Sequence, residues 1–208
     1  MIMKRLSNQI LLLACLVTAA FTLSSCLDSD DDDNGYTNEQ IQQAMLSMQG
    51  NYTGASVAAI SLTEHDSINN VNWSADSIIT VSNFPLSNIA FFLNKSTDSN
   101  VKAVGEALKA LGSTELKINY GYYGMNETAI SLVTEGRPLE LSVASGGKTV
   151  KVKVTFAPYQ RIDYTYGIFR KAENKTLFLL TVTELTIDDV PVSLPTTPQI
   201  LLTSKMKI

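Results

Sequence analysis

Apolar and polar residues alternate along much of the second half of the chain. Three stretches show this period of two most clearly, with apolar positions at Leu116, Ile118, Tyr120 and Tyr122, at Val150, Val152, Val154 and Phe156, and at Ile162, Tyr164, Tyr166 and Ile168. A strand with this pattern buries one face and exposes the other, which favours antiparallel pairing. Further strands are expected over Leu177–Ile187 and Gln199–Ile208, and the second of these is expected to close the sheet.

A helical period appears at two places in the first half. Thr37–Gln49 carries apolar residues at helical spacing, begins with a threonine that can cap a helix, and is followed by Gly50. A second region, at about 86–111, consists of a short helix and then a longer one from Asp98 to Leu111, which Gly112 ends. We expect this region to be a helical insert between strands.

The remaining segments complete a mainly β fold. Tyr52–Leu62 and Asp76–Ser82 are expected to be strands, and Gly146-Gly147 and Asp188-Asp189 to be hairpin turns. Three prolines before the last strand favour an edge or a loop: Pro191, Pro195 and Pro198. The sequence therefore predicts one α+β domain over 36–208, with an antiparallel sheet of about eight or nine strands and two or three short helices. Periodicity leaves open whether this sheet is barrel-like or a sandwich.

The first 25 residues have the features of a lipoprotein signal peptide. Lys4 and Arg5 precede an apolar stretch, Ile10–Leu23, which is too short to span a bilayer but fits a secretory segment. Leu23-Ser24-Ser25-Cys26 resembles the lipobox of bacterial lipoproteins, in which cleavage leaves the cysteine as a diacylated N-terminus. The resemblance implies that Cys26 carries a lipid and that a membrane is one partner of this protein.

Residues 26–35 are expected to be a lipidated, acidic tether. The acidic residues are Asp28, Asp30, Asp31, Asp32 and Asp33, and such a run of like charges repels itself and stays extended. An acidic tract directly after the lipidated cysteine resembles the export signal of Bacteroidetes surface lipoproteins, which implies an outer-membrane, cell-surface location. The tract also matches the start of a calcium-binding EF-hand loop, but Ile41 stands where a bidentate glutamate is required, so no metal site is predicted.

Composition and charge exclude several classes of protein. The 208 residues are 45% hydrophobic and 17% charged, which provides enough apolar content for a core and too much for a disordered chain. The formal net charge is -4 and no basic run occurs, so no nucleic-acid partner is expected. Cys15 lies in the predicted signal peptide and Cys26 would carry the lipid, so the mature chain is expected to form no internal disulfide.

The sequence contains no recognisable catalytic or cofactor-binding constellation. His65, the only histidine, lies in a polar stretch expected to be a loop, and no Gly-x-Ser-x-Gly motif presents a nucleophile. Ser145 and Lys148 have the spacing of penicillin-recognising enzymes, but the glycines between them favour a hairpin over a helix. A carboxylate pair such as Asp163 with Glu184 would suit glycan hydrolysis only at a separation of about 5–10 Å. We therefore predict neither an enzyme nor a cofactor.

Tyrosines are concentrated between residues 120 and 166. Four of them fall on the apolar faces of predicted strands: Tyr120, Tyr122, Tyr164 and Tyr166. Buried aromatic rings commonly pack in a core with their hydroxyl groups at its rim. The alternative is a cavity in which the phenols hydrogen-bond a small ligand. These four tyrosines are the candidate ligand-binding residues, and the sequence does not decide between core and pocket.

Two short motifs point to a covalent modification. Asp66-Ser67-Ile68 and Asp76-Ser77-Ile78 resemble the Asp-Ser/Thr-apolar sequence of Bacteroidetes O-glycosylation. The resemblance implies that Ser67 and Ser77 are candidate O-glycosylation sites, in a compartment consistent with the predicted export.

A wider pattern resembles a family of uncharacterised Bacteroidetes lipoproteins. It consists of Gly50-Asn51-Tyr52-Thr53-Gly54, then Trp73, then Asn83-Phe84-Pro85-Leu86 followed by an apolar helix. The first part, after a short helix, also resembles the opening of lipocalin-type barrels. The family carries no known activity, so no functional residue is transferred from it.

These features predict a non-enzymatic binding or accessory lipoprotein of the cell surface, with a small molecule, a glycan or a protein as its partner. A first alternative is a structural or adhesin-like subunit of a surface assembly, for which Gln199–Ile208 would offer a strand edge. A less favoured alternative is a glycan-active enzyme with a carboxylate pair. Each of these functions has to be argued from a site.

Overall fold

The structure is a computed structural model in which residues 36–159, 165–194 and 197–208 are described. The chain divides into two compact units, Met1–Thr37 and Asn38–Ile208, and the second holds every described strand and helix. The predicted signal peptide (1–25) and tether (26–35), and with them Cys26, lie outside the described residues. Among the described helices, none combines the length and the apolar character that a membrane crossing needs.

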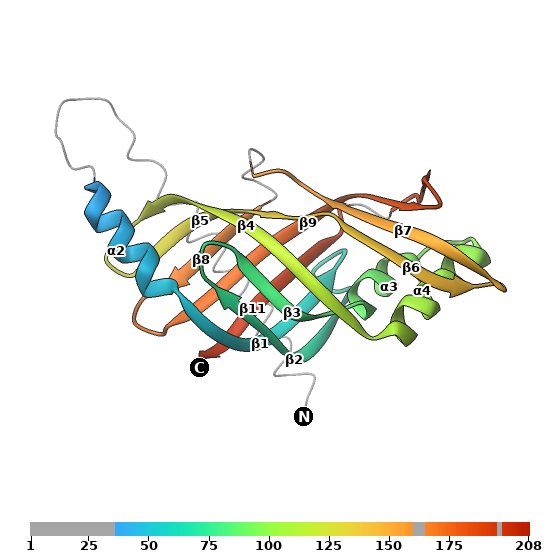
Figure 1. Ribbon diagram of the computed structural model, residues 1–208, viewed down its shortest axis with the longest axis horizontal. Coiled ribbons are helices and arrows are strands. Elements are labelled where there is room, and N and C mark those ends of the chain that lie inside the picture. The colour runs from blue at the N-terminus through green and yellow to red at the C-terminus, as the bar shows by residue number, and fades with distance from the viewer. Residues whose placement is uncertain (1–35, 160–164, 195–196) are drawn as a thin grey trace. The chain divides into compact units, whose positions relative to one another are not determined.

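Eight antiparallel strands close into a barrel (Figure 1). They are β1 (Gly50–Ala59), β2 (His65–Ala75), β3 (Ile79–Pro85), β4 (Ser113–Met125), β5 (Ala129–Gly136), β8 (Tyr166–Arg170), β9 (Lys175–Ile187) and β11 (Gln199–Lys207). Each strand pairs with the next in the order β11-β1-β2-β3-β4-β5-β8-β9, and β9 pairs back with β11. The predicted mainly β, antiparallel fold is confirmed, and its form is a barrel.

A second, smaller sheet extends from the barrel because β9 is longer than the strands beside it. The first part of β9 pairs with β8 and β11 as far as Thr181, and the part from Val182 to Ile187 pairs with β7 (Lys148–Phe156). β7 pairs in turn with β6 (Leu139–Ser145), and β10 (Val190–Pro191) pairs with the end of β9. We call this sheet, of order β10-β9-β7-β6, the side sheet.

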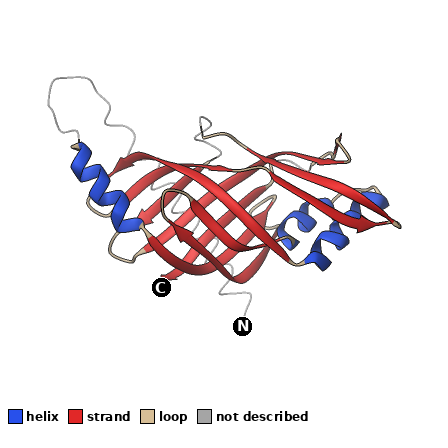
Figure 2. Cartoon of the chain, viewed as in Figure 1, coloured by secondary structure: helices blue, strands red, loops and turns tan. Residues whose placement is uncertain are grey.

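The described part of the chain contains three helices (Figure 2). They are α2 (Asn38–Met48), α3 (Ser87–Leu93) and α4 (Ser99–Leu111). Asp98 caps α4, since its carboxylate accepts a hydrogen bond from the N–H of Asn100 at 2.8 Å. Gly112 ends the helix with a φ of 89°, a conformation that favours glycine. The helices thus lie where the helical periods predict them.

Side chains from alternate strand positions fill the barrel. Tyr52 of β1 is completely buried and stacks on Trp73 of β2, with the ring centroids 6.1 Å apart. The Tyr52 hydroxyl donates a hydrogen bond to the carbonyl oxygen of Met48, which ties the end of α2 to the barrel. Phe169 of β8 and Phe178 of β9 are also fully buried. Burial of this apolar surface is the main term that stabilises the folded chain.

The alternation predicted for residues 150–156 appears in β7, where Val150, Val152 and Val154 are buried and the lysines between them are exposed. The buried face of the side sheet continues across β9 through Leu185, which is opposite Val154. β6, which lies on the opposite side of β7 from β9, packs against α4 (Figure 1). The helical insert therefore covers part of the side sheet.

The predicted inward face of the strand around residue 166 is wrong. The alternation placed Tyr166 and Ile168 inward, but the buried positions of β8 are Gly167 and Phe169. A Cβ atom at Gly167 would lie 2.9 Å from a ring carbon of Phe178. The phenylalanine ring occupies the space of the missing side chain, so the inward position carries no hydrophobic signal in the sequence.

Two further expectations about strands are also wrong. His65, expected in a loop, is the first residue of β2 and pairs with Ala59. Much of β2 is polar, and its fully buried positions, Val71, Trp73 and Ala75, are confined to its second half, which weakens the alternation. The strand at Gln199–Ile208 is not a free edge, because β11 pairs with β1 on one side and with β9 on the other.

Candidate functional site

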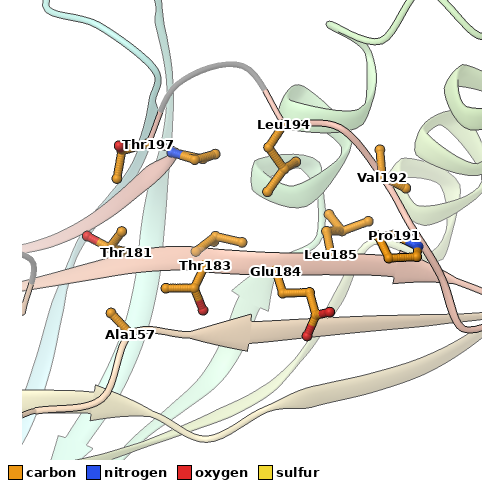
Figure 3. Close-up of a pocket in the computed structure, with 11 residues that line it drawn as sticks. Ala157, Thr181, Thr183, Glu184, Leu185, Pro191, Val192, Leu194 and Thr197 are labelled. Atoms are coloured by element: carbon orange, nitrogen blue, oxygen red, sulfur yellow. The ribbon is translucent and has the colours of Figure 1, made fainter.

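A groove opens beside β9, between this strand and residues that follow β10 in the chain (Figure 3). We call residues 191–198 the strap, of which 195 and 196 lie outside the described residues, and the space between it and β9 the strap groove. β9 lines the groove with Thr181–Leu185, and the strap lines it with Pro191, Val192, Leu194, Thr197 and Pro198. Its volume of about 530 Å³ is within the range of small-molecule sites.

The groove lies at a β-bulge in β9. Glu184 is opposite Thr155 of β7 and Val182 is opposite Phe156, so Thr183 is an extra residue on the β9 side. Thr183 and Glu184 are both exposed, whereas the flanking Val182 and Leu185 are buried. Bulges reorient side chains and are frequent beside functional sites. Here the bulge places two consecutive polar side chains in the groove.

Hydrogen bonds hold the strap to β9 at its two ends. The N–H of Val192 donates to the carbonyl oxygen of Leu185 at 2.8 Å, and the N–H of Val182 donates to the carbonyl oxygen of Pro198 at 2.9 Å. The β9 stretch between these contacts spans three residues, or roughly 10 Å of strand.

The floor of the groove is formed by β9, and Ala157, which follows β7 in the chain, also lines it. Successive residues of a strand point to opposite faces of the sheet, yet five consecutive residues, Thr181–Leu185, all line this cavity. A cavity in contact with both kinds of position reaches the backbone between them. On the β7 side, Glu184 has a sheet partner, Thr155. On the strap side, no described residue pairs with Thr183 or Glu184.

The groove combines apolar walls with a few polar groups. Leu194 points from the strap toward β9 (Figure 3), and Val192 and Leu194 are partly buried against the core. Among the described lining residues, Glu184 is the sole ionisable side chain. The hydroxyl of Thr183 donates to the carbonyl oxygen of Thr155 at 3.2 Å. In the described residues, no cluster of histidine, cysteine or acidic side chains could hold a metal ion.

A second, smaller cavity of about 170 Å³ lies over β4 and β5. Tyr120, Gly121, Val133 and Tyr159 are among its lining residues. The hydroxyl of Tyr120 donates a hydrogen bond to the carbonyl oxygen of Asp76, so this phenol is already engaged within the protein. The cavity is below the usual size of a ligand site.

The three candidate tyrosines that the structure describes, Tyr120, Tyr122 and Tyr166, do not line one common cavity. Tyr120 and Tyr122 are partly buried against the barrel core, on the face of β4 that carries Leu116 and Ile118, whereas Tyr166 lies on the outer face of β8, opposite to Phe169. Tyr164 lies outside the described residues. Burial raises the pKa of both Tyr120 and Tyr166 above the ordinary value for a phenol. Their role in ligand binding stays a prediction.

The two candidate modification sites differ in accessibility. Ser67 is half-buried within β2 and is paired with Val57. Ser77 is exposed in the turn between β2 and β3, where the N–H of Asp76 donates to the carbonyl oxygen of Ile78 at 3.2 Å. The turn therefore presents Ser77 more openly than the strand presents Ser67.

Sequence reasoning named one groove residue, Glu184, as half of a carboxylate pair, but did not identify the groove. The proposed partner, Asp163, lies outside the described residues. The available signal was the polar pair Thr183-Glu184 within the otherwise apolar stretch 177–187, followed by several prolines. A polar pair in such a strand indicates a bulge, because strict alternation would bury one of the two residues.

Fold and groove together define a small β-barrel domain with a side sheet and a cleft beside the strand that the barrel and the side sheet share. The chain belongs to a family described as a domain of unknown function (DUF4840), whose model matches residues 47–187. The match ends at the last residue of β9, so the strap and β11 follow it in the chain. No curated protein and no solved structure matches the chain.

Proposed function

We propose that this protein is a lipid-anchored cell-surface lipoprotein that binds a ligand without transforming it, and that the strap groove is its binding site. The observation that carries the proposal is the cleft of about 530 Å³ beside the β9 bulge at Thr183. Concave sites with apolar walls and a few convergent polar groups are the usual form of binding sites. The groove has both properties.

The composition of the groove supports binding over catalysis. Glycoside hydrolysis requires two carboxylic groups that face each other across the substrate. The described lining residues supply one carboxylate, Glu184, and neither a histidine nor a cysteine. Such a lining suits recognition through shape, hydroxyl groups and one negative charge.

The sequence at the N-terminus supports the location. Cys26, the last residue of the lipobox-like Leu23-Ser24-Ser25-Cys26, is followed by the run of aspartates and lies 12 positions before Asn38, the first residue of α2. A Cys26→Ser variant is expected to lose both incorporation of a labelled fatty acid and surface exposure to an added protease. A variant that still incorporates the label would contradict anchoring through this residue.

Native mass spectrometry tests the binding site. The full chain is purified from its own cell surface as wild type and as Thr183→Trp, which fills the groove from an exposed position. The matched control is Thr149→Trp, at an exposed position of β7 outside the groove lining. We expect a co-purifying, non-covalent mass in the wild type and in Thr149→Trp that is absent from Thr183→Trp.

Equal retention of that mass in both tryptophan variants would show that the ligand lies elsewhere. The cavity beside Tyr120 would then be the next candidate. Absence of any non-covalent mass from all three proteins, at unchanged thermal stability, would contradict a tightly bound ligand.

A subunit of a surface assembly is a second candidate, because β6 has a single strand partner in the described structure. An edge strand offers unpaired backbone groups to another chain. A proline at Ser142, which is exposed in β6, removes one backbone donor from that strand. If β6 mediates assembly, Ser142→Pro shifts the native oligomer toward the monomer in sedimentation, whereas Ser142→Ala does not.

A further inference from the structure

We infer that two copies of this chain join through β6, so that their side sheets form one continuous antiparallel sheet. The inference deepens the second candidate function, on which it rests, and it does not depend on the strap groove. Its basis is the free edge of β6 (Leu139–Ser145), which among the described residues pairs with β7 on one side and with no strand on the other.

The hairpin turn shows which backbone groups of β6 point to the free edge. Gly146 and Gly147 form a two-residue turn with φ values of 59° and 78°, and Ser145 is paired with Lys148 beside it. The residues that flank such a turn exchange hydrogen bonds, and hydrogen-bonded pairs then alternate with pairs that are not bonded. Counted back from Ser145, every second residue of β6 therefore uses its N–H and C=O groups toward β7. The groups of the residues between them point to the free edge: Glu140, Ser142 and Ala144.

This edge is open and lacks the usual protection. The three residues whose backbone groups point outward are all exposed, and in the described part of the chain no hydrogen bond beyond the ladder with β7 involves them. Free sheet edges usually carry a lysine, a proline or a bulge, or are very short, which prevents pairing with another chain. β6 has seven residues, none of them lysine or proline, and its register with β7 is regular. Such an edge is suited to receive another strand.

A second copy of β6 matches this edge. A two-fold axis places the same surface of two subunits opposite itself, and two identical strands related in this way run antiparallel. An axis at Ser142 sets this residue opposite Ser142 of the second copy, and Glu140 of each copy opposite Ala144 of the other. All the outward backbone groups then lie in hydrogen-bonded pairs, each of which exchanges two N–H···O=C bonds.

Neighbouring registers fit less well. An axis at Glu140 would set two carboxylates directly opposite each other, and like charges in that position destabilise a sheet. An axis at Leu141 would set Ala144 opposite Pro138, which has no backbone N–H to donate. The axis at Ser142 avoids both problems.

The side chains of β6 agree with the axis at Ser142. Leu139 and Val143 are buried on the face of β6 that contributes to the core, whereas Leu141 between them is only partly buried. Directly opposite residues of an antiparallel pair lie on the same face, so Leu141 meets Val143 of the second copy, which covers its exposed part. On the outer face, Glu140 lies between Lys153 of its own β7 and an uncharged alanine, so no like charges meet.

The proposed lipid anchor favours a second copy over an unrelated chain. A seven-residue edge is a small contact, and two proteins that diffuse separately gain little from it. Copies attached to one membrane meet at a high effective concentration, which raises the fraction of paired molecules without any additional contact.

Cysteine cross-linking of the full chain on its own cell surface tests the inference. The Cα atoms of a hydrogen-bonded antiparallel pair are about 5.5 Å apart, within the range of about 4.4–6.8 Å that a disulfide bridges. Under mild oxidation we expect Ser142→Cys to give a disulfide-linked species of twice the monomer mass. Thr149→Cys, at an exposed position on the same face of β7, is the matched control and is expected to behave like the wild type.

A mixed experiment tests the register. Cells that produce Glu140→Cys and Ala144→Cys together are expected to give a cross-linked dimer, because these residues are opposite each other. Neither variant is expected to cross-link when produced alone. In this register the two copies of residue 140 are about 14 Å apart along the strands, and so are the two copies of residue 144.

Equal cross-linking of Ser142→Cys and Thr149→Cys would overturn the inference. A dimer formed by Glu140→Cys alone would show that the register is wrong. If Ser142→Pro shifts a native oligomer toward the monomer but Ser142→Cys forms no dimer, β6 pairs with a different chain and only the identity of the partner fails. If the native protein sediments as a monomer, the second candidate function fails as well.

Discussion

Asn88 of α3 donates a hydrogen bond from its side-chain amide to the hydroxyl of Ser56 in β1, and both side chains are fully buried. This bond is a polar contact between the helical insert and the barrel wall. Removing one partner leaves the other buried without its bond, which costs about 1–3 kcal/mol. We therefore predict that Asn88→Ala and Ser56→Ala each lower the free energy of unfolding by an amount in this range, measured by urea denaturation.

The double variant separates the bond from the packing. If the hydrogen bond is the common cause, the loss in Asn88→Ala with Ser56→Ala is smaller than the sum of the two single losses. Strict additivity would show that the amide and the hydroxyl act independently. Asn100→Ala, at an exposed position of α4, serves as a control for an asparagine substitution in the insert.

Tyr52 makes the fold sensitive to alkaline pH. Burial, followed by the nearby Tyr120, raises the pKa of Tyr52 from 10.0 to about 12. The phenol ionises at a lower pH in the unfolded chain than in the folded protein. The stability that this pKa difference contributes is therefore fully present below pH 10 and is lost as the pH rises toward 12. The expected loss is roughly 2–3 kcal/mol over this window.

The Tyr52→Phe variant tests this linkage. At pH 8 we expect it to be less stable by about 1 kcal/mol, because the hydrogen bond to the Met48 carbonyl is lost. Between pH 10 and 12 the wild type should lose stability faster than the variant, so that the difference shrinks and reverses. Lys207, whose ammonium lies 5.8 Å from the ring centroid, is present in both proteins. A constant difference at every pH would contradict the assignment to Tyr52.

Gly54 is a position where the barrel tolerates no side chain. A Cβ atom there would lie 2.1 Å from the carbonyl oxygen of Thr203 and 2.8 Å from the Trp73 ring. The first of these neighbours is backbone of β11, which pairs with β1 on this side. We predict that Gly54→Ala destabilises the protein by roughly 3 kcal/mol or more, since overpacking at an inflexible site is among the severe mutational effects.

Gly124 provides the contrast within another barrel strand. No atom lies within 4 Å of the position that its Cβ would occupy. Gly124→Ala is therefore expected to change the free energy of unfolding by no more than about 0.5 kcal/mol. Thermal unfolding of both variants beside the wild type decides the comparison, and equal losses at the two positions would refute the packing argument.

Elements whose signal is local could be predicted from the sequence. α4 has its cap at Asp98 and its end at Gly112, and these residues act through contacts within a few positions of the chain. The alternation in β7 is equally visible, because one face of that strand is buried and the other is wet. Such features do not depend on which distant segment lies opposite.

The strap groove could not be predicted, because it depends on register between distant segments. The bulge at Thr183 exists only relative to β7, and the groove depends on where β10 and β11 pair along β9. The inward face of β8 could not be predicted for a related reason. Its inward residue Gly167 has no side chain, and the ring of Phe178 in the neighbouring strand fills the space beside it. In each case the feature depends on a contact between residues far apart in the chain, and a local sequence pattern does not show which residues meet.

The turn between β9 and β10 allows a stabilising substitution. Asp188 and Asp189 have φ values of 48° and 65°, a left-handed conformation that disfavours residues with a side chain. Hairpin turns of this kind prefer glycine at the second position. We predict that Asp189→Gly raises the free energy of unfolding by roughly 0.5–1 kcal/mol.

Asp188→Gly is the matched comparison at the neighbouring position. The carboxylate of Asp188 accepts a hydrogen bond from the N–H of Lys151 at 2.8 Å, and this bond holds the turn to β7. Its loss should cancel the gain in backbone freedom, so Asp188→Gly is expected to be neutral or destabilising in urea denaturation. A larger gain at Asp188 than at Asp189 would mean that the carboxylate contact contributes nothing.

O-glycosylation, if the predicted export is correct, should favour Ser77 over Ser67. Ser77 is exposed in a turn, where an enzyme can reach the hydroxyl, whereas Ser67 is half-buried in a strand paired on its backbone with Val57. We expect protein from the native cell surface to carry a covalent mass increment that is absent after expression in a host without this modification. The increment should disappear in Ser77→Ala and persist in Ser67→Ala. Loss in Ser67→Ala alone would show that a residue of the barrel wall is modified and would reverse the predicted order.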